Sequence, residues 1–134
     1  MEKNIPLIIL ISLLLINSVF SKKEKEFTCL TKYLHKLNKD NLGEIEFTME
    51  KCILSQEKYK SLFDYKGVLK QYGIEWGYES MSKADISKLG AEPVLALIIG
   101  AFRADRFYEG TFFDFFKNGS LTKWLKRLKE IDEH

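Results

Sequence analysis

The chain has 134 residues, of which 21 are Lys or Arg and 19 are Asp or Glu, so its formal net charge is only +2. A near-neutral balance gives no electrostatic case for nucleic-acid binding, which normally needs a strongly basic surface. The two histidines, His35 and His134, lie far apart, and no Cys-x-x-Cys or His-x-x-x-His spacing occurs. We therefore predict no metal site and no cofactor.

The first 21 residues have the pattern of a secretory signal peptide. Lys3 precedes an apolar run from Ile5 to Ile16, and the segment ends in Val-Phe-Ser at Ser21, where a signal peptidase would cut. We expect a signal peptide over residues 1–21 and a secreted or exported protein; the alternative is a membrane anchor formed by an uncleaved N-terminal segment. Removing 21 of 134 residues leaves 113, which suits one domain over residues 22–134.

The chain contains two cysteines, Cys29 and Cys52, both in the expected mature part. In an exported protein such a pair predicts a disulfide, which would close a loop of roughly two dozen residues and contribute about 3 kcal/mol. The alternative is two buried thiols. Neither cysteine has a neighbouring base or an oxyanion-forming turn in sequence, so a cysteine nucleophile is poorly supported.

The first half of the mature chain predicts helices with one short extended element. Apolar residues at helical spacing indicate an amphipathic helix over residues 24–37 and further helices over 56–65 and 67–72. Ile45, Phe47 and Met49 instead alternate with polar residues, which predicts a short strand over 43–49. The segment 74–80 alternates in the same way and predicts either an edge strand paired with 43–49 or an aromatic loop.

Trp76 and Tyr78 stand out in that second segment. Two aromatic side chains beside acidic residues suit a surface on which a sugar or base stacks. The alternative, and the commoner use of aromatic residues, is to fill the core.

The longest helical pattern begins near Pro93 and leads into residues 103–110, which read RADRFYEG. If the helical rotation continues to Glu109, Asp105 falls within the apolar stripe and Glu109 beside it. Buried carboxylates are costly unless they are paired, so we expect Arg103 and Arg106 to neutralise them. The cluster is then either a structural charge network or a site for a ligand or for acid/base catalysis.

Two further helices are predicted after Gly110. Thr111 and Asp114 form a start signal for a short helix that carries four phenylalanines, and residues 118–119 stop it. Ser120 then starts a last helix with one apolar stripe and an opposite basic side, which is either solvated or docks an acidic partner. Residues 118–120 also fit an N-glycosylation acceptor.

Four segments of the second half carry a resemblance to a known family: YGIEWGYESMS (72–82), RADRFYEG (103–110), DFFKNG (114–119) and WLKRLKEID (124–132). Over residues 72–132 the chain resembles a family of small, mostly bacterial proteins known only as a domain of unknown function. The resemblance implies a small helical domain, related to segments that occur fused to macrodomains handling ADP-ribose. Where the family commonly has cysteine, this chain has Tyr108 and Ser120, which suits an oxidising compartment.

We therefore expect a mostly α, small single-domain helical bundle with a possible minor two-stranded β element, preceded by the signal peptide. The first function hypothesis is a non-enzymatic interaction or accessory module whose partner is a protein. The second is a small enzyme or a nucleotide or ADP-ribose binder, in which Arg103 or Arg106 grips a small anionic ligand and Asp105 or Glu109 is the base. No Ser-His-Asp pattern or phosphate-binding glycine loop supports an enzyme.

Overall fold

The computed structural model describes residues 25–134, so the predicted signal peptide lies outside the described part of the chain. The fold is mostly helical, as expected, and residues 25–134 contain no strand. In chain order the elements, with η marking 3-10 or π-helical turns, are α2 (Thr28–Thr31), η1 (Lys39–Asn41), α3 (Leu42–Thr48), η2 (Met49–Leu54), η3 (Glu57–Asp64), α4 (Tyr65–Gln71), α5 (Tyr78–Lys83), α6 (Ala91–Ala104), α7 (Thr111–Lys117) and α8 (Ser120–Glu133). No helix in this range has the length and apolar character needed to cross a bilayer.

Helix α6 is the centre of the fold. Every residue from Pro93 to Phe102 is buried, so the helix has no solvent-facing side in that stretch. A helix that is apolar all round is stable only when neighbours surround it. Pro93 lies in the first turn, where the missing N–H breaks no helical hydrogen bond, and this part of the prediction is confirmed.

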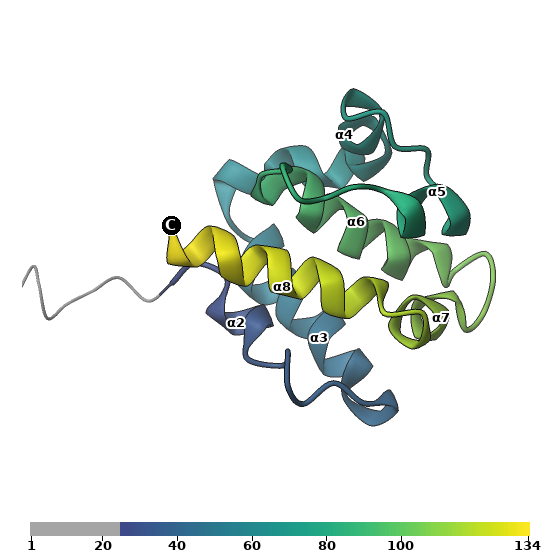
Figure 1. The fold of residues 1–134 in the computed structure, drawn as a ribbon, viewed down its shortest axis with the longest axis horizontal. Helices are drawn as coiled ribbons and strands as arrows, with labels where there is room; N and C mark the ends of the chain where they lie inside the picture. Colours follow the sequence, from purple (N-terminus) through teal and green to yellow (C-terminus); the bar gives the residue numbers. More distant parts are fainter. Residues whose placement is uncertain (1–24) are drawn as a thin grey trace, which may run out of the picture.

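The remaining helices surround α6 (Figure 1). Helix α4 packs along one side of α6, and α8 runs back along another side in the opposite direction. Helix α7 packs at the C-terminal end of α6, while α2 and α3 lie on the far side of α8 in this view. The C-terminal helix therefore joins the two halves of the chain in one core, to which the buried side chains of α2, α3, α4, α6, α7 and α8 all belong.

The predicted strand over residues 43–49 is wrong, because these residues belong to helix α3. The buried side chains of α3 and η2 are Leu42, Ile45, Met49 and Ile53, which recur every three or four residues. Phe47, which the alternating pattern placed beside Ile45, is 59% exposed. Over seven residues, helical spacing and strand alternation both place Ile45 and Met49 on one side. Leu42 fits only the helical spacing, so its burial favours the helix.

The predicted edge strand over residues 74–80 is also absent. Tyr72 and Gly73 end α4, and Gly73 has the left-handed φ of 73° that a non-glycine residue adopts with strain. The chain then turns at residues 74–77 and enters α5 at Tyr78. The N-terminal helix predicted over 24–37 is likewise shorter, since only α2 is α-helical, although Phe27, Leu30 and Leu34 are buried as its apolar stripe requires.

Gly100 lets the loop before α5 approach α6 closely. The indole Nε1 of Trp76 donates a hydrogen bond of 3.0 Å to the Gly100 carbonyl oxygen. A Cβ atom at position 100 would lie 3.3 Å from Trp76 Cδ1 and 3.1 Å from the terminal methyl carbon of Met81, which is fully buried. The hydrogen bond holds the indole in place, so the ring has little freedom to retreat from an added methyl group.

We expect Gly100→Ala to lower the free energy of unfolding by about 1–2 kcal/mol, because overpacking at Trp76 and Met81 outweighs the helix propensity gained. Gly43→Ala is the matched control: it also lies in a helix, but nothing lies within 4 Å of its added methyl group, so stability should stay equal or rise. Urea titration measures both variants. An equally stable Gly100→Ala protein would contradict the close packing described for Trp76.

Candidate functional site

The segment between α6 and α7 lies at the surface, which corrects the expected buried carboxylates. Helix α6 ends at Ala104, so the helical rotation does not carry through to Glu109. Asp105, Arg106 and Glu109 are all exposed, while Arg103 is half-buried at the end of the helix. Among residues 25–134, no ion pair joins these four side chains to one another. The predicted neutralised cluster facing the core is therefore wrong.

Asp105 instead organises the start of α7. Its Oδ1 accepts a hydrogen bond of 3.1 Å from the backbone N–H of Phe112, one of the N–H groups at the start of α7 that lack a helical partner. Gly110 precedes the helix with a left-handed φ of 89° and offers no side-chain cap. Thr111, the expected capping residue, donates its hydroxyl backwards to the Tyr108 carbonyl at 2.6 Å. A carboxylate seven residues upstream of Phe112 thus takes the role expected of Thr111.

The two arginines lie close enough to Glu46 on α3 and Tyr65 on α4 for their charges to affect both groups. Burial raises the pKa of Glu46 on α3, and neighbouring Glu50 raises it further, whereas the positive charges of Arg103 and Arg106 oppose these effects. Burial also raises the pKa of Tyr65 at the start of α4, again opposed by both arginines. The structure thus brings Arg103 and Arg106 near groups far away in sequence, without joining either arginine to a carboxylate in an ion pair among the described residues.

Large aromatic side chains are exposed in the same segment. Phe107 is 65% exposed and Tyr108 is 73% exposed. The Phe107 ring meets Trp76 nearly edge to face, with 5.6 Å between ring centroids, and the Lys66 ammonium lies 4.0 Å from the centroid of the Trp76 ring. Trp76 is thus partly a core residue and partly the base of an exposed aromatic group, while its use as a stacking surface for a sugar or base stays a prediction.

A pocket of about 420 Å³ opens beside this aromatic group. Most of its wall is apolar, and it lies between the start of α5, the end of α6 and the first turn of α7. Its lining consists of Trp76, Gly77, Tyr78, Ala104, Tyr108, Thr111 and Asp114. The sequence pattern indicated Trp76 and Tyr78 as an aromatic surface, but it indicated Asp114 only as part of a helix start signal. Nothing in the sequence pattern shows that α5 and α7 meet.

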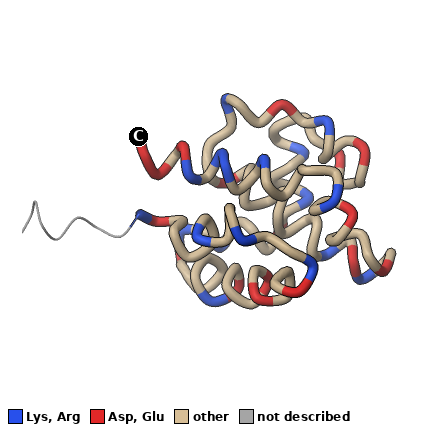
Figure 2. The backbone as a smooth tube through the Cα atoms, turned by 60° about the horizontal axis from the view of Figure 1, so that its bottom comes forward, with Lys and Arg blue, Asp and Glu red and all other residues tan. Residues whose placement is uncertain are grey.

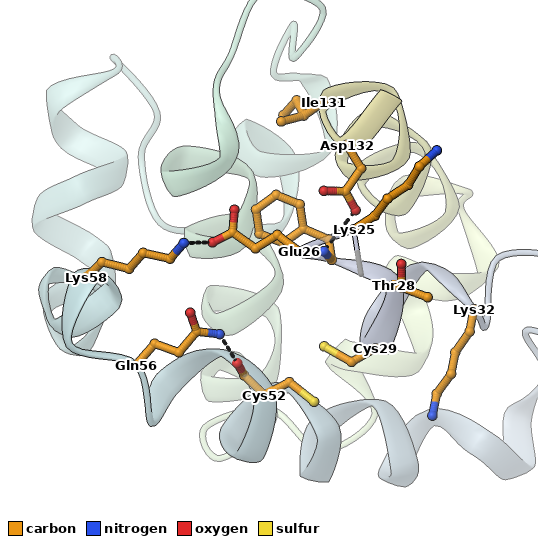
Figure 3. A pocket seen from close by; sticks show the side chains of 11 residues that line it. Lys25, Glu26, Thr28, Cys29, Lys32, Cys52, Gln56, Lys58, Ile131 and Asp132 are labelled. Atoms are coloured by element: carbon orange, nitrogen blue, oxygen red, sulfur yellow. Dashed lines mark hydrogen bonds and ion pairs between the residues drawn. The ribbon is translucent and has the colours of Figure 1, made fainter. Parts of the chain in front are cut away.

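A second pocket, of about 860 Å³, lies between α2, η2 and the end of α8 (Figure 3). Its polar groups hold the helices together: the Phe27 N–H donates to Asp132 Oδ2 at 2.8 Å, and the Tyr59 hydroxyl donates to Glu26 at 2.6 Å. Lys58 also forms an ion pair with Glu26. The charges on Glu26 and Asp132 are thus already engaged within the chain.

The predicted disulfide between Cys29 and Cys52 is wrong, because both residues are free thiols. They line the same pocket but are not covalently joined (Figure 3). Burial raises the pKa of the Cys29 thiol to about 12, and the contact with Cys52 adds to the effect. A thiol with so high a pKa is a poor nucleophile at neutral pH.

The basic side of α8 has a structural role that the sequence did not reveal. Lys123 donates to the carbonyl oxygens of Ser82 and Ala84, and Arg127 Nε donates to the Leu89 carbonyl at 3.0 Å. These contacts hold the loop between α5 and α6 against α8. Figure 2 shows Lys and Arg interspersed with Asp and Glu around the described chain, in keeping with its mixed charge.

Asn118 holds a second junction in the same region. Its Nδ2 donates to the Tyr78 hydroxyl and to Ser82 Oγ, while its Oδ1 accepts from the Ser120 N–H at 2.9 Å. Ser120, the third residue of the possible glycosylation signal, is only 4% exposed. Asn118 therefore connects α5 to the junction of α7 and α8, and a glycan on this nitrogen would break both of its donor contacts.

Comparison with protein-family models matches residues 48–134 to DUF6508, which is described as a family of unknown function. The match contains the whole stretch of residues 72–132 on which the resemblance rests, and it extends to α3. Comparisons with curated proteins and with solved structures gave no match.

We predict that Asp105→Ala lowers the free energy of unfolding by about 1 kcal/mol, because Phe112 N–H loses its acceptor. Asp105→Asn keeps an acceptor oxygen and should lose less. Glu109→Ala and Arg106→Met, at exposed positions with no such bond, should change stability by less than about 0.5 kcal/mol. Thermal and urea unfolding distinguish the four variants. Equal losses in all of them would instead indicate the charge network that the sequence suggested.

We also predict that Cys29 reacts slowly with alkylating reagents. Its pKa of about 12 lies three pH units above the ordinary 9.0, so at pH 8 its thiolate fraction is about a thousandfold lower than that of an unstructured cysteine. In the folded protein the rate should rise about tenfold from pH 9 to pH 10, whereas the rate for a cysteine of pKa 9.0 rises less than about twofold. Mass spectrometry of the peptide carrying Cys29 measures it separately from Cys52. Labelling as fast as in urea-unfolded protein would contradict the shift.

Proposed function

The chain belongs to DUF6508, and because the description of that family names no activity, we propose a function from the geometry: a non-enzymatic module that binds a protein partner through residues 103–110. The observation that carries this proposal is the exposure of Phe107 and Tyr108, at 65% and 73%, beside the exposed Arg106. Aromatic residues and arginine are enriched at the centres of protein interfaces, where they contribute most of the binding energy.

The position of the segment supports this reading. Residues 105–110 form a loop between two packed helices at one end of the molecule (Figure 1), so a partner can reach them without moving the core. Asp105 fixes one end of the loop by its bond to Phe112 N–H, and Thr111 fixes the other through the Tyr108 carbonyl. A loop held at both ends loses little conformational entropy when it binds, which favours affinity.

The same contacts weaken the case for an enzyme. Asp105, one of the two carboxylates expected to act as a base, already accepts a hydrogen bond from the backbone. Both Asp105 and Glu109 are exposed, whereas a general base is usually tuned by burial or by a charged partner. The cluster therefore supports binding better than it supports catalysis.

One observation favours a second candidate, a small anionic ligand such as a nucleotide or ADP-ribose. The charges of Arg103 and Arg106 both act on Glu46 and Tyr65, so the two arginines share these neighbours. Within residues 25–134, neither arginine forms an ion pair. Two guanidinium groups that form no ion pair with a carboxylate suit phosphate, which arginine binds through two parallel hydrogen bonds.

We further propose that the module is exported, on the basis of the signal-peptide pattern in residues 1–21.

The test places a photo-crosslinking amino acid at position 107 in the producing cells, with position 63 as the matched control. Phe63 is 67% exposed, close to the 65% of Phe107, and it lies on η3, outside residues 103–110. We expect one discrete crosslinked protein from position 107 and none from position 63, since only the first lies on the binding surface. The mass of the recovered chain also tests export, because cleavage after Ser21 removes residues 1–21.

Identical crosslinking patterns from the two positions would refute the proposed interface. A thermal-shift series with ADP-ribose and common nucleotides examines the second candidate, because a ligand that binds only the folded protein raises its melting temperature. A shift that disappears in Arg103→Met would favour the anionic ligand over the protein partner.

A further inference from the structure

We propose that the pocket between α5 and the α6–α7 junction binds a small organic cation, specifically a quaternary ammonium compound of about the size of choline. The pocket measures about 420 Å³, within the usual range of roughly 300–1,000 Å³ for small-molecule sites. This inference goes beyond the proposed function, since it concerns a small ligand and does not require a protein partner.

The charge of the pocket selects a cation. Asp114 is the one charged side chain among the seven residues of the lining. Within residues 25–134, no group donates a hydrogen bond to the Asp114 carboxylate or forms an ion pair with it. A single negative charge at the edge of a mostly apolar pocket disfavours an anionic ligand and favours a positive one.

The aromatic side chains of the pocket also favour a cation. Trp76, Tyr78 and Tyr108 all line the pocket, and aromatic rings attract cations through the negative potential of their faces. Trp76 already shows this property, because the Lys66 ammonium lies 4.0 Å from its ring centroid. Lys66 itself does not belong to the lining, so it leaves the pocket open.

The polar groups of the lining distinguish a quaternary from a primary amine. The Thr111 hydroxyl is engaged with the Tyr108 carbonyl, and the Tyr78 hydroxyl accepts from Asn118 Nδ2 at 3.0 Å. A primary ammonium carries three N–H donors that each need an acceptor, and the pocket offers few besides Asp114. A methylated ammonium has no N–H group, and its methyl groups can pack against the three rings.

The pocket is held in shape by contacts outside it. Trp76 is fixed by its bond to the Gly100 carbonyl, and the Tyr78 ring packs on the buried Phe115 with 5.0 Å between centroids. Asn118 joins Tyr78 to the end of α7. The rings of Trp76 and Tyr78 therefore need little rearrangement to receive a ligand, which lowers the entropic cost of binding.

The experiment titrates the chain with choline and follows the indole N–H of Trp76 by NMR. Trp124, which is fully buried and outside the pocket, supplies an internal reference. We expect a saturable shift at Trp76 with a Kd of about 1 mM or tighter, and no comparable shift at Trp124. Dimethylbutanol, in which a tert-butyl group replaces the trimethylammonium group, is the neutral control and should bind at least about tenfold more weakly.

Two variants locate the site. Asp114→Asn removes the charge at an exposed position, and Tyr108→Leu removes one ring; each should weaken choline binding by about tenfold with an unchanged melting temperature. Lys66→Gln should leave the affinity equal or tighter, since it removes a neighbouring positive charge. The absence of a saturable shift, equal binding of the neutral control, or an unchanged Kd in Asp114→Asn would each overturn the proposal.

Discussion

The whole structure depends on the burial of helix α6 on all of its sides. Ten consecutive residues, Pro93 to Phe102, are removed from water, and this is stable only if other helices supply an apolar surface in every direction. The short helices of the first half and the longer α8 meet that requirement together. Because α6 is enclosed, its C-terminal end is the point where the chain must return to the surface, and the exposed segment begins there.

The site regions follow from this constraint. Asp105 ends the buried helix and starts the next one by accepting from Phe112 N–H, so the loop between them is short and fixed. Gly100 allows Trp76 to lie directly on α6, and this contact brings the start of α5 beside α7. The aromatic pocket and the exposed Phe107 are both consequences of these contacts at one end of the central helix.

The sequence predicted the helical class, the central helix and the last two helices because their apolar periodicity extends over many residues. It failed where a short segment fits two periods, as at Ile45 and Phe47, since only the tertiary partner decides which side chain is buried. The cluster of Arg103, Asp105, Arg106 and Glu109 was misplaced for another reason: the helix was assumed to continue past Ala104. The sequence pattern did not indicate Asp114 as a pocket residue, because its neighbours Trp76 and Tyr78 lie far away in the sequence.

Helix α6 should be the last element to lose its structure, and native-state hydrogen exchange measures whether it is. If enclosure of α6 holds the fold together, the amides of Ala96 to Phe102 should exchange only through global unfolding, with opening free energies equal to that of the whole domain. Amides of the short α5 should exchange through local opening at lower free energy. Exchange in α6 as fast as in α5 would show that the fold does not depend on the enclosure of α6.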